Sequence, residues 1–373
     1  MTLPRRQRPK VLHFVTGGFS GATQVAVDLV RAHGASGRFD ALLVLRRKRT
    51  TLPERVRALQ ADGLRVELVP GWSHAATVWA LASLCRRFQP DILVAHGYSE
   101  HLWGRYAGLL AGVRHLVHVE HNSRERYNAW RLVQARWLAR RTDAIVGCSE
   151  GVRSALLGYG FPQDRVHAIP NGIRLEPYAN APAHTFVQRI PGIVMAARFA
   201  RQKDHATLLQ AVALLRTRGL RPPVLLAGGG KASARRAAER LAQTLGLADQ
   251  VTFLGHCNDV PGLLKGHQIC VLSTHYEGMP LSLIEGMAAG CAVVGSQVVG
   301  VQEVVDSGRT GLLVEHANPQ ALADALATLL NQPQDAARMA AAAHAEVLQR
   351  YGLNTMTDRY EALLGSLLEK PVL

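Results

Sequence analysis

The chain has 373 residues, of which 48% are hydrophobic, and a formal net charge of +15. This length suits two domains better than one, and the apolar content is that of a folded protein rather than a disordered one. No apolar run is long enough to predict a transmembrane helix. The five cysteines are scattered without a C-x-x-C pair, which excludes a disulfide framework and indicates buried, reduced thiols in a cytosolic chain.

The positive charge is concentrated in the first half. Residues 1–180 contain 26 Lys and Arg against 13 Asp and Glu, whereas the remainder contains 17 against 15. This asymmetry predicts that the N-terminal half faces something anionic. Nucleic acid, an acidic membrane face and a phosphorylated acceptor all fit, although no nucleic-acid motif or aromatic RNA platform accompanies the charge.

Strands are predicted to alternate with helices through the first half. A ragged basic tail, which imitates a signal peptide until Thr16-Gly17-Gly18 interrupts the apolar run, is expected before the first strand. The alternation predicts a doubly wound, mostly parallel sheet. The expected strands are 11–15, 41–45, 66–69, 92–96, 116–120, 144–148 and 166–169.

A glycine turn follows the first strand. Gly17, Gly18 and Gly21 precede a helix expected over 22–33, and such a turn permits close approach of the backbone to a ligand. The spacing is not the dinucleotide-binding fingerprint. A plain tight turn is therefore the alternative.

Two basic segments have a structural and a membrane interpretation. The run Arg-Arg-Lys-Arg at 46–49 is ordinarily a solvated surface, but it could also contact anionic lipid. Segment 124–141 is predicted to be a basic helix with Trp130, Val133 and Trp137 on one face. We expect this stripe to pack in the core, and an interfacial membrane helix is the alternative.

Histidines gather in the first half. His96 and His121 fall at the carboxyl ends of predicted strands, the edge where open α/β sheets bind ligands. His101, His115 and His118 are expected to be structural. No H-E-x-x-H or similar spacing points to a metal, so no metal site is predicted.

The second half repeats the pattern after a crossing point. Ile169-Pro-Asn-Gly-Ile173 ends the first domain, and 175–190, rich in Ala and Pro, is the expected linker. Helices are expected over roughly 318–369. The expected strands are 193–197, 224–227, 251–254, 269–272, 292–296 and 311–314.

Cations follow the first strand of the second half. Arg198 and Lys203 lie in the loop to the next helix, which Asp204 is expected to cap. Two cations at the carboxyl edge of the sheet could clamp a diphosphate and stabilise it as it leaves.

The segment 273–290 carries the clearest chemistry. It follows an apolar strand, contains Pro280 where a helix could begin and closes on Gly290. A helix N-terminus offers free N–H groups and about half a positive charge to a phosphate. Glu277 in the loop and Glu285 in the helix could each accept hydrogen bonds from neighbouring hydroxyls of a sugar or ribose. Sugar, phosphate and ribose together describe a nucleotide-sugar.

These segments resemble the retaining GT-B glycosyltransferases of the family-four type. Glu277-Gly-Met-Pro-Leu with Glu285 is similar to the Glu-x7-Glu motif, and ARFxxQKD around Arg198 and Lys203 is similar to the Arg and Lys pair. The crossing point resembles Pro-Asn-Gly-hydrophobic-Asp, except that Arg174 replaces the Asp.

The resemblance implies a GT-B fold, an α/β architecture of two Rossmann-like doubly wound domains across a cleft. The expected parts are an acceptor-binding domain at 1–174, the linker at 175–190, a nucleotide-sugar domain at 191–350 and a C-terminal helix at 351–373 that crosses back. His121, Arg198, Lys203 and Glu277 are implied to be catalytic. The implied donor-binding residues are Gly17, Gly18, Arg198, Lys203, Gly228, Gly255, His256, Glu277, Gly278, Met279, Pro280, Leu281, Ser282 and Glu285.

The implied activity is retaining, metal-independent sugar transfer from a nucleotide-diphospho-sugar, with UDP favoured and no cofactor. The acceptor would be a saccharide or a lipid-linked acceptor of bacterial cell-surface polysaccharide or glycolipid synthesis. We expect a cytoplasmic chain, with an anionic membrane surface as a further partner of its basic half and no nucleic acid. The alternatives are a nucleotide-sugar epimerase or a phosphorylase on the same fold and, in another class, a basic nucleic-acid-binding protein without enzymatic activity.

Overall fold

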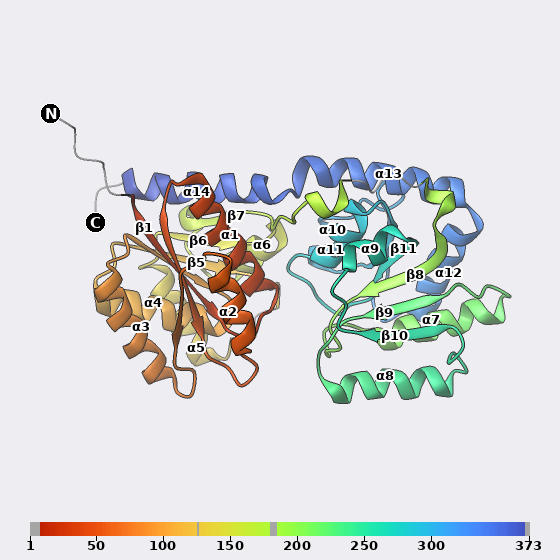
Figure 1. Cartoon of the computed structure of the whole chain (residues 1–373), viewed down its shortest axis with the longest axis horizontal. Helices are drawn as coiled ribbons and strands as arrows, with labels where there is room; N and C mark the ends of the chain where they lie inside the picture. Colours follow the sequence, from red (N-terminus) through yellow and green to blue (C-terminus); the bar gives the residue numbers. More distant parts are fainter. Residues whose placement is uncertain (1–7, 125–126, 180–184, 370–373) are drawn as a thin grey trace. The chain divides into compact units, whose positions relative to one another are not determined.

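The computed structural model describes residues 8–124, 127–179 and 185–369. The chain forms two compact units, which we call unit 1 (Met1–Asn171 with Asn354–Leu373) and unit 2 (Gly172–Leu353). In each unit a parallel sheet is covered by helices on both faces (Figure 1). The two-domain Rossmann-like fold class is thereby confirmed. The expected basic tail falls mostly at residues 1–7, outside the described residues.

Unit 1 contains a seven-stranded sheet in the order β3-β2-β1-β4-β5-β6-β7. Its strands are β1 (Lys10–Thr16), β2 (Asp40–Arg46), β3 (Val66–Val69), β4 (Ile92–His96), β5 (His115–Glu120), β6 (Ala144–Gly147) and β7 (Val166–Ala168). The helices are α1 (Gly21–Ser36), α2 (Pro53–Ala61), α3 (His74–Phe88), α4 (Tyr98–Ala111), α5 (Ala129–Ala139), α6 (Glu150–Gly158) and α14 (Leu353–Glu369).

Strand β1 shows how the unit 1 core is built. Successive side chains of a strand point to opposite faces, and both faces of β1 are buried. Leu12 and Phe14 pack in a cluster with residues of α3 and α4. Val15 packs in a second cluster with residues of α1 and α2. A strand buried on both sides is a nearly continuous apolar run, so His13 in the middle of β1 has to be accommodated inside the protein.

Unit 2 contains a six-stranded sheet in the order β10-β9-β8-β11-β12-β13. Its strands are β8 (Ile190–Ala196), β9 (Val224–Ala227), β10 (Val251–Gly255), β11 (His267–Leu272), β12 (Ala292–Ser296) and β13 (Leu312–Val314). Its helices are α7 (His205–Thr217), α8 (Ala232–Thr244), α9 (Val260–Lys265), α10 (Leu281–Ala288), α11 (Val299–Gln302), α12 (Pro319–Asn331) and α13 (Pro333–Arg350).

The predicted strands are present in both units, with differences only at their ends. The largest difference is in β8, which begins at Ile190 because its N–H donates to the Gly266 carbonyl at 3.0 Å. Residues 180–184 of the predicted linker lie outside the described residues, and its described part contains the short 3-10 turns Glu176–Tyr178 and Phe186–Gln188. At the crossing point the N–H of Ile173 donates to Tyr351 O, and the N–H of Leu353 donates to Ile173 O, each at 2.8 Å.

The expectation that a tryptophan stripe of α5 packs in the core is wrong. Trp130, Val133 and Trp137 are 71%, 56% and 44% exposed. The helix instead buries its opposite face, Ala135, Leu138 and Ala139. Helical periodicity defines both faces of such a helix but does not say which of them packs against the protein.

The glycine loop after β9 is shaped by its contacts with the loop after β8. Gly228 has a φ of 152°, and a Cβ there would lie 2.1 Å from the carbonyl oxygen of Ala197. Its N–H donates to Gly255 O at 2.6 Å. Gly229, by contrast, has no atom within 4 Å of its Cβ position. Gly228 is therefore required for backbone packing, and its neighbour is not.

We predict that Gly228→Ala lowers the free energy of unfolding by about 1–3 kcal/mol, because the new methyl group must displace backbone. Gly229→Ala is the matched control and should change it by less than about 0.5 kcal/mol. Urea denaturation of both variants measures the difference. Equal stability of the two variants would contradict the packing argument.

Candidate active site

The candidate site of unit 2 lies where the strand order reverses. Strands β8 and β11 are parallel neighbours in the middle of the sheet, and their connections leave toward opposite sides. This is the switch point at which open α/β sheets bind ligands. The loops after the two strands are joined by backbone hydrogen bonds: the N–H of Asp204 donates to Ser273 O at 3.0 Å and that of His275 to Gln202 O at 2.9 Å.

Lys203 and Glu277 form an ion pair across these two loops. The Lys203 ammonium contacts Glu277 Oε1, and the two side chains are only 14% and 8% exposed. The Thr274 hydroxyl donates to the same Glu277 oxygen at 3.0 Å. A hydrogen-bonded and largely buried pair of this kind is held in one geometry. The two charges that the sequence places 74 residues apart are thus fixed side by side.

Arg198 and the start of α10 complete this edge. Arg198 is exposed, and no described residue pairs with it. Asp204 caps α7 as expected, accepting from the Thr207 N–H at 3.1 Å. Pro280 is the N-cap of α10, and Gly290 follows the helix with a φ of 73°. The Arg189 guanidinium donates to the carbonyls that directly follow this helix, Ala289 O at 2.7 Å and Gly290 O at 2.9 Å.

Glu285 lies on α10 and has no hydrogen bond or ion pair to a described residue. It is half-buried, and burial raises its pKa to about 7. The neighbouring phenol of Tyr178 is buried, and its pKa is raised by burial and then by Glu285. A carboxyl group with this pKa loses its proton and becomes a carboxylate when hydrogen-bond donors reach it, because donors favour the ionised form.

The remaining predicted donor-binding residues of unit 2 lie in the same set of loops. Gly278, Met279 and Pro280 are buried, whereas Leu281 and Ser282 are half-buried. Gly300 covers Gly278 so closely that a Cβ on Gly300 would lie 2.5 Å from the Gly278 carbonyl oxygen. Gly255 ends β10 with a φ of 70°, and His256 after it is exposed.

In unit 1 the predicted glycine turn packs against Arg46, which forms ion pairs described below. Gly17 donates its N–H to Arg46 O at 2.8 Å, and a Cβ at Gly17 would lie 2.7 Å from that oxygen. Gly18 has only ordinary contacts. The close approach at Gly17 is therefore explained by packing inside the protein.

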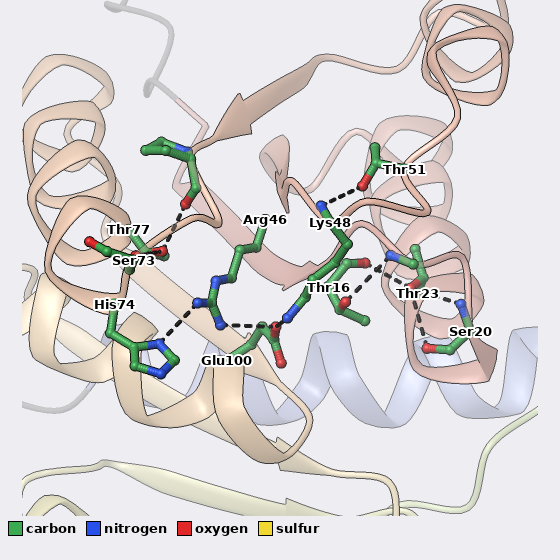
Figure 2. Close-up of polar contacts among 12 residues, drawn as sticks. Thr16, Ser20, Thr23, Arg46, Lys48, Thr51, Ser73, His74, Thr77 and Glu100 are labelled. Atoms are coloured by element: carbon green, nitrogen blue, oxygen red, sulfur yellow. Dashed lines mark hydrogen bonds and ion pairs between the residues drawn. The ribbon is translucent and has the colours of Figure 1, made fainter.

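The basic run 46–49 is not simply a solvated surface, which corrects the expectation for its first residue. Arg46 is 3% exposed and lies between His74 and Glu100 (Figure 2). Its guanidinium donates to His74 Nδ1 at 2.9 Å and contacts Glu100 at 3.6 Å, while Lys48 reaches the same carboxylate at 2.9 Å. The sequence could not show this, because Glu100 comes from α4, far along the chain.

The histidines at the carboxyl edge of unit 1 form a row that includes one unpredicted member. His121 Nε2 lies 3.3 Å from His96 Nδ1, and His96 Nε2 lies 3.0 Å from His13 Nδ1. The side chain of Glu120 accepts the N–H of His121 at 2.8 Å. Burial lowers the pKa of His121 to about 4. The sequence analysis missed His13 because it lies inside an apolar strand. Side chains alternate between the two faces of a strand, so counting along the strands could have indicated that His13 shares a face with His96 and His121.

Among the described residues, a second group of histidines, on the opposite face, is close enough together to hold a metal. His101, His118 and Glu120 are buried, with ligand atoms within 4.8 Å of one another. However, His101 Nε2 contacts the Tyr127 hydroxyl at 2.9 Å, and its Nδ1 accepts from Arg105. Arg105 is fully buried and donates to Thr142 Oγ1 at 3.0 Å. A guanidinium in this position already supplies the cation that Glu120 needs, so the group balances charge inside unit 1.

The buried histidines make unit 1 sensitive to acid. Burial is the largest cause that lowers the pKa in each of His13, His33, His96, His101, His118 and His121. The folded pKa of such a group lies below the unfolded value of about 6.5. The unfolded chain therefore binds more protons below pH 6.5, and stability that is complete above this pH is lost as the pH falls.

We predict a loss of about 2 kcal/mol in the free energy of unfolding by pH 5 for each histidine that stays neutral in the folded protein. Tryptophan fluorescence in urea measures it for unit 1, because all five tryptophans lie between 72 and 137. A free energy of unfolding that is constant between pH 7.5 and 5 would show that these histidines are not held neutral.

Comparison with known families matches both halves of the chain. Residues 19–177 match the family described as Glycosyltransferase Family 4, and residues 181–346 match Glycosyl transferases group 1. The protein named "Putative glycosyltransferase EpsF" from Bacillus subtilis is 30% identical over 321 residues, covering 80% of this chain and 81% of EpsF. The lipopolysaccharide core biosynthesis glycosyltransferase LpsE from Rhizobium meliloti is 26% identical over 238 residues, covering 61% of this chain and 65% of LpsE.

Solved structures agree with the fold. The crystal structure of HepE from Anabaena in complex with UDP and glucose superposes with a TM-score of 0.83 and 22% identity, covering 96% of this chain and 100% of HepE. These findings lead to one assignment. The two family matches divide the chain near its crossing point, a relative is similar over four fifths of both chains, and the architecture is shared with a solved glycosyltransferase-like fold. The chain belongs to the GT-B glycosyltransferases of the family-4 type.

Proposed function

We propose that this glycosyltransferase moves a sugar from a nucleotide-diphospho-sugar, preferentially a UDP-sugar, to a saccharide or lipid-linked acceptor, with retention of configuration and without a metal ion. The acceptor would belong to bacterial cell-surface polysaccharide or glycolipid synthesis, and the enzyme would work in the cytoplasm at the inner face of the membrane. UDP is supported by the HepE complex, and a lipopolysaccharide-type acceptor by the name of LpsE.

The observation that carries the proposal is the joined pair of loops after β8 and β11. They bring Arg198, the Lys203–Glu277 pair and the N-terminus of α10 to one edge of unit 2. A diphosphate needs positive charge, whereas sugar hydroxyls need a carboxylate that accepts hydrogen bonds. Both kinds of group are present at this edge and are held by backbone hydrogen bonds.

We assign the departing diphosphate to Arg198, Lys203 and the first N–H groups of α10. Charge that develops on the leaving phosphate would be stabilised by groups that are already oriented, and the helix N-terminus adds its partial positive charge. This arrangement supplies what a divalent cation supplies in other transferases. Glu285, with its pKa near 7, would ionise as it accepts the ribose hydroxyls.

We assign the sugar hydroxyls to Glu277. Its carboxylate is positioned by Lys203 and Thr274, so the two joined loops would fix the position of the sugar relative to the diphosphate. Retention would follow from attack of the acceptor on the face from which the diphosphate leaves, with the acceptor's proton passing to that phosphate. In this scheme no covalent bond to the protein forms, and His121 keeps the catalytic role that the family resemblance implies.

The proposed membrane contact is supported by exposed tryptophans and arginines of unit 1. Trp72 and Trp79 are 84% and 72% exposed, and Trp130 is 71% exposed. Helices α3, α4 and α5, which carry or adjoin these residues, pack side by side on one face of the sheet (Figure 1). Arg86, Arg87, Arg140 and Arg141 are also exposed, and Arg141 lies over the Trp137 ring. Exposed tryptophan together with arginine suits an anionic bilayer surface. Within the described residues, the helices are too short or too polar to cross a bilayer.

We predict that one nucleotide-sugar from a panel of UDP-, GDP- and ADP-sugars binds the purified protein and is slowly hydrolysed by it. Glu277→Ala should abolish transfer and hydrolysis while leaving the fold intact, and Arg198→Ala should lower kcat by about 100-fold or more, as loss of a charge-stabilising group does.

Lys265→Ala is the matched control, since it removes a positive charge at the amino edge of the same sheet, where Lys265 donates to Pro177 O. It should keep full activity. Hydrolysis by Glu277→Ala at the parental rate would refute the site assignment, and failure of all nucleotides to bind would refute the donor class.

We predict that the protein co-sediments with vesicles of anionic lipid at low salt and is released at high salt. The double substitution of Trp130 and Trp137 by Ala should weaken this binding at least tenfold, because apolar insertion adds to the charge attraction. Leu348→Ala, which trims a 48% exposed side chain of unit 2, should not change it. Absence of binding at low salt would refute the membrane contact.

A further inference from the structure

His74, the first residue of α3, is held by two neighbouring side chains. Arg46 Nη2 lies 2.9 Å from His74 Nδ1, and Figure 2 shows the guanidinium between this imidazole and Glu100. The Trp103 ring stacks on the imidazole, with the ring centroids 4.1 Å apart and an interplanar angle of 21°. A ring that is hydrogen-bonded at one atom and stacked on one face has little freedom to turn. The imidazole therefore presents its other nitrogen, Nε2, in a fixed direction.

The contact with Arg46 also decides which nitrogen of His74 carries the proton. A guanidinium has only donors, so His74 Nδ1 must accept, and the neutral ring carries its proton on Nε2. Partial burial lowers the pKa of His74, and the charges of Arg46, Arg131 and Lys48 lower it further. The carboxylate of Glu100 has a smaller effect in the opposite direction. The ring is thus neutral at pH 7, and because His74 is an exposed residue, its Nε2–H is open to a ligand.

The start of α3 adds backbone donors at the same residue. The first N–H groups of a helix have no partner within the helix. The Ser73 hydroxyl accepts the N–H of Ala76 at 3.0 Å, whereas the N–H groups of His74 and Ala75 have no hydrogen-bond partner among the described residues. The helix is 15 residues long, and a helix N-terminus carries about half a positive charge. This turn thus supplies an imidazole N–H, backbone N–H groups and a positive dipole.

The charged side chains beside His74 carry an excess of positive charge. Arg46 and Lys48 both contact one oxygen of Glu100, Oε1, at 3.6 and 2.9 Å, so a single carboxylate serves two cations. Arg46 is 3% exposed, and its Nε has no hydrogen-bond partner among the described residues. A cation with so little access to water is stabilised by a further anion that comes close. The surroundings of His74 therefore suit a negatively charged ligand.

We propose that His74 and the first turn of α3 form a binding site for a phosphate ester, and that this ester is part of the acceptor. The site lies at the carboxyl edge of the unit 1 sheet, because α3 follows β3 and Arg46 ends β2, and open α/β sheets bind ligands at this edge. A phosphate offers several oxygens to separate donors and supplies negative charge to the cations. The inference rests on the proposed function and narrows its acceptor to a phosphorylated saccharide.

The phosphate ester could belong to a free phosphorylated saccharide or to the link between a saccharide and a lipid. Trp72, two residues before His74, is 84% exposed, and Trp79 of α3 is 72% exposed. Exposed tryptophan beside a phosphate site suits a lipid. Both sources share the phosphate chemistry, and they differ in whether an alkyl chain adds to the affinity.

The site is tested by NMR on the complete protein with nitrogen-15-labelled tryptophan, without nucleotide-sugar. The indole N–H of Trp103 reports on the site because its ring stacks on His74, and all five tryptophans lie in unit 1. Methyl phosphate is compared with sodium chloride at equal ionic strength. We expect a saturable shift of the Trp103 signal with methyl phosphate and none with chloride. Absence of a saturable shift would overturn the proposal.

Two substitutions of His74 separate its donor from its contact with Arg46. The side chains of His74→Gln and His74→Glu can both accept from the guanidinium, but only that of His74→Gln can also donate to a ligand. His74→Glu should raise the dissociation constant of methyl phosphate about tenfold or more, because a hydrogen bond to a charged group is lost, whereas His74→Gln should stay near the parental value. Arg57→Ala, which removes an exposed positive charge of α2, should bind as the parent does. Equal affinity of His74→Glu and the parent would contradict the assignment of the donor.

An alkyl chain on the phosphate distinguishes the two sources. Dodecyl phosphate in micelles of a neutral detergent replaces methyl phosphate in the same titration. For a lipid-linked acceptor we expect it to bind about tenfold tighter or more, and Trp72→Ala to remove this gain, because tryptophan inserts beside the chain. Equal affinity of the two esters, with both weakened by His74→Glu, would indicate a free phosphorylated saccharide. Tighter binding of dodecyl phosphate that His74→Glu leaves unchanged would contradict the site.

The assignment of the phosphate to the acceptor depends on transfer, whereas phosphate binding does not. With the donor identified, transfer is compared between a phosphorylated saccharide and the same saccharide without its phosphate. We expect the parent to prefer the phosphorylated one, and His74→Glu to raise its KM about tenfold or more with a much smaller change in kcat, since binding is affected rather than chemistry. Equal transfer to both saccharides would show that the bound phosphate is not the acceptor's. Absence of any transfer would refute the proposed function and leave the binding result standing.

Discussion

The parallel pairing of strands at the switch point of each sheet is the constraint on which the rest of the molecule depends. In unit 2 it joins β8 to β11, and in unit 1 it joins β1 to β4. Two loops that leave adjacent strands in opposite directions create an edge that side chains of both can reach. The Lys203–Glu277 contact, the exposed Arg198 and the start of α10 all follow from the first pairing, and the His13–His96 contact follows from the second.

Buried polar groups are compensated by charge pairing in both units, and unit 1 adds a set of buried imidazoles. In unit 2 the Lys203–Glu277 pair is charged, and each partner compensates the other. In unit 1, Arg105 is fully buried beside Glu120, and Arg46 is buried against Glu100. Buried imidazoles such as His13 and His96, whose pKa burial lowers, add polarity without charge. An unpaired buried charge costs far more than a neutral ring that shares hydrogen bonds.

The candidate site of unit 2 was largely predictable from the sequence. Its residues lie in short loops directly after apolar strands, and an adjacent parallel strand brings such loops together without further information. The candidate site of unit 1 was less predictable from the sequence. His96 and His121 could be placed at the carboxyl edge, whereas His13, Arg46 and Glu361 could not, since their partners come from distant elements. For α5, the periodicity allowed either of two faces to be the buried one, and we expected the tryptophan face, which is exposed.

The sequence by itself determined the succession of strands and helices, the division into two Rossmann-like halves and the loops that carry cations and carboxylates. These are local properties, because an apolar run, a glycine turn or a capping Asp acts within a few residues. Only the tertiary structure decided which histidines touch, that Arg46 is buried against Glu100, that the tryptophans of α5 face outward and that Glu361 of α14 meets His33. These outcomes depend on strand register and helix packing, whose energies arise between residues far apart in the chain, so no single segment contains them.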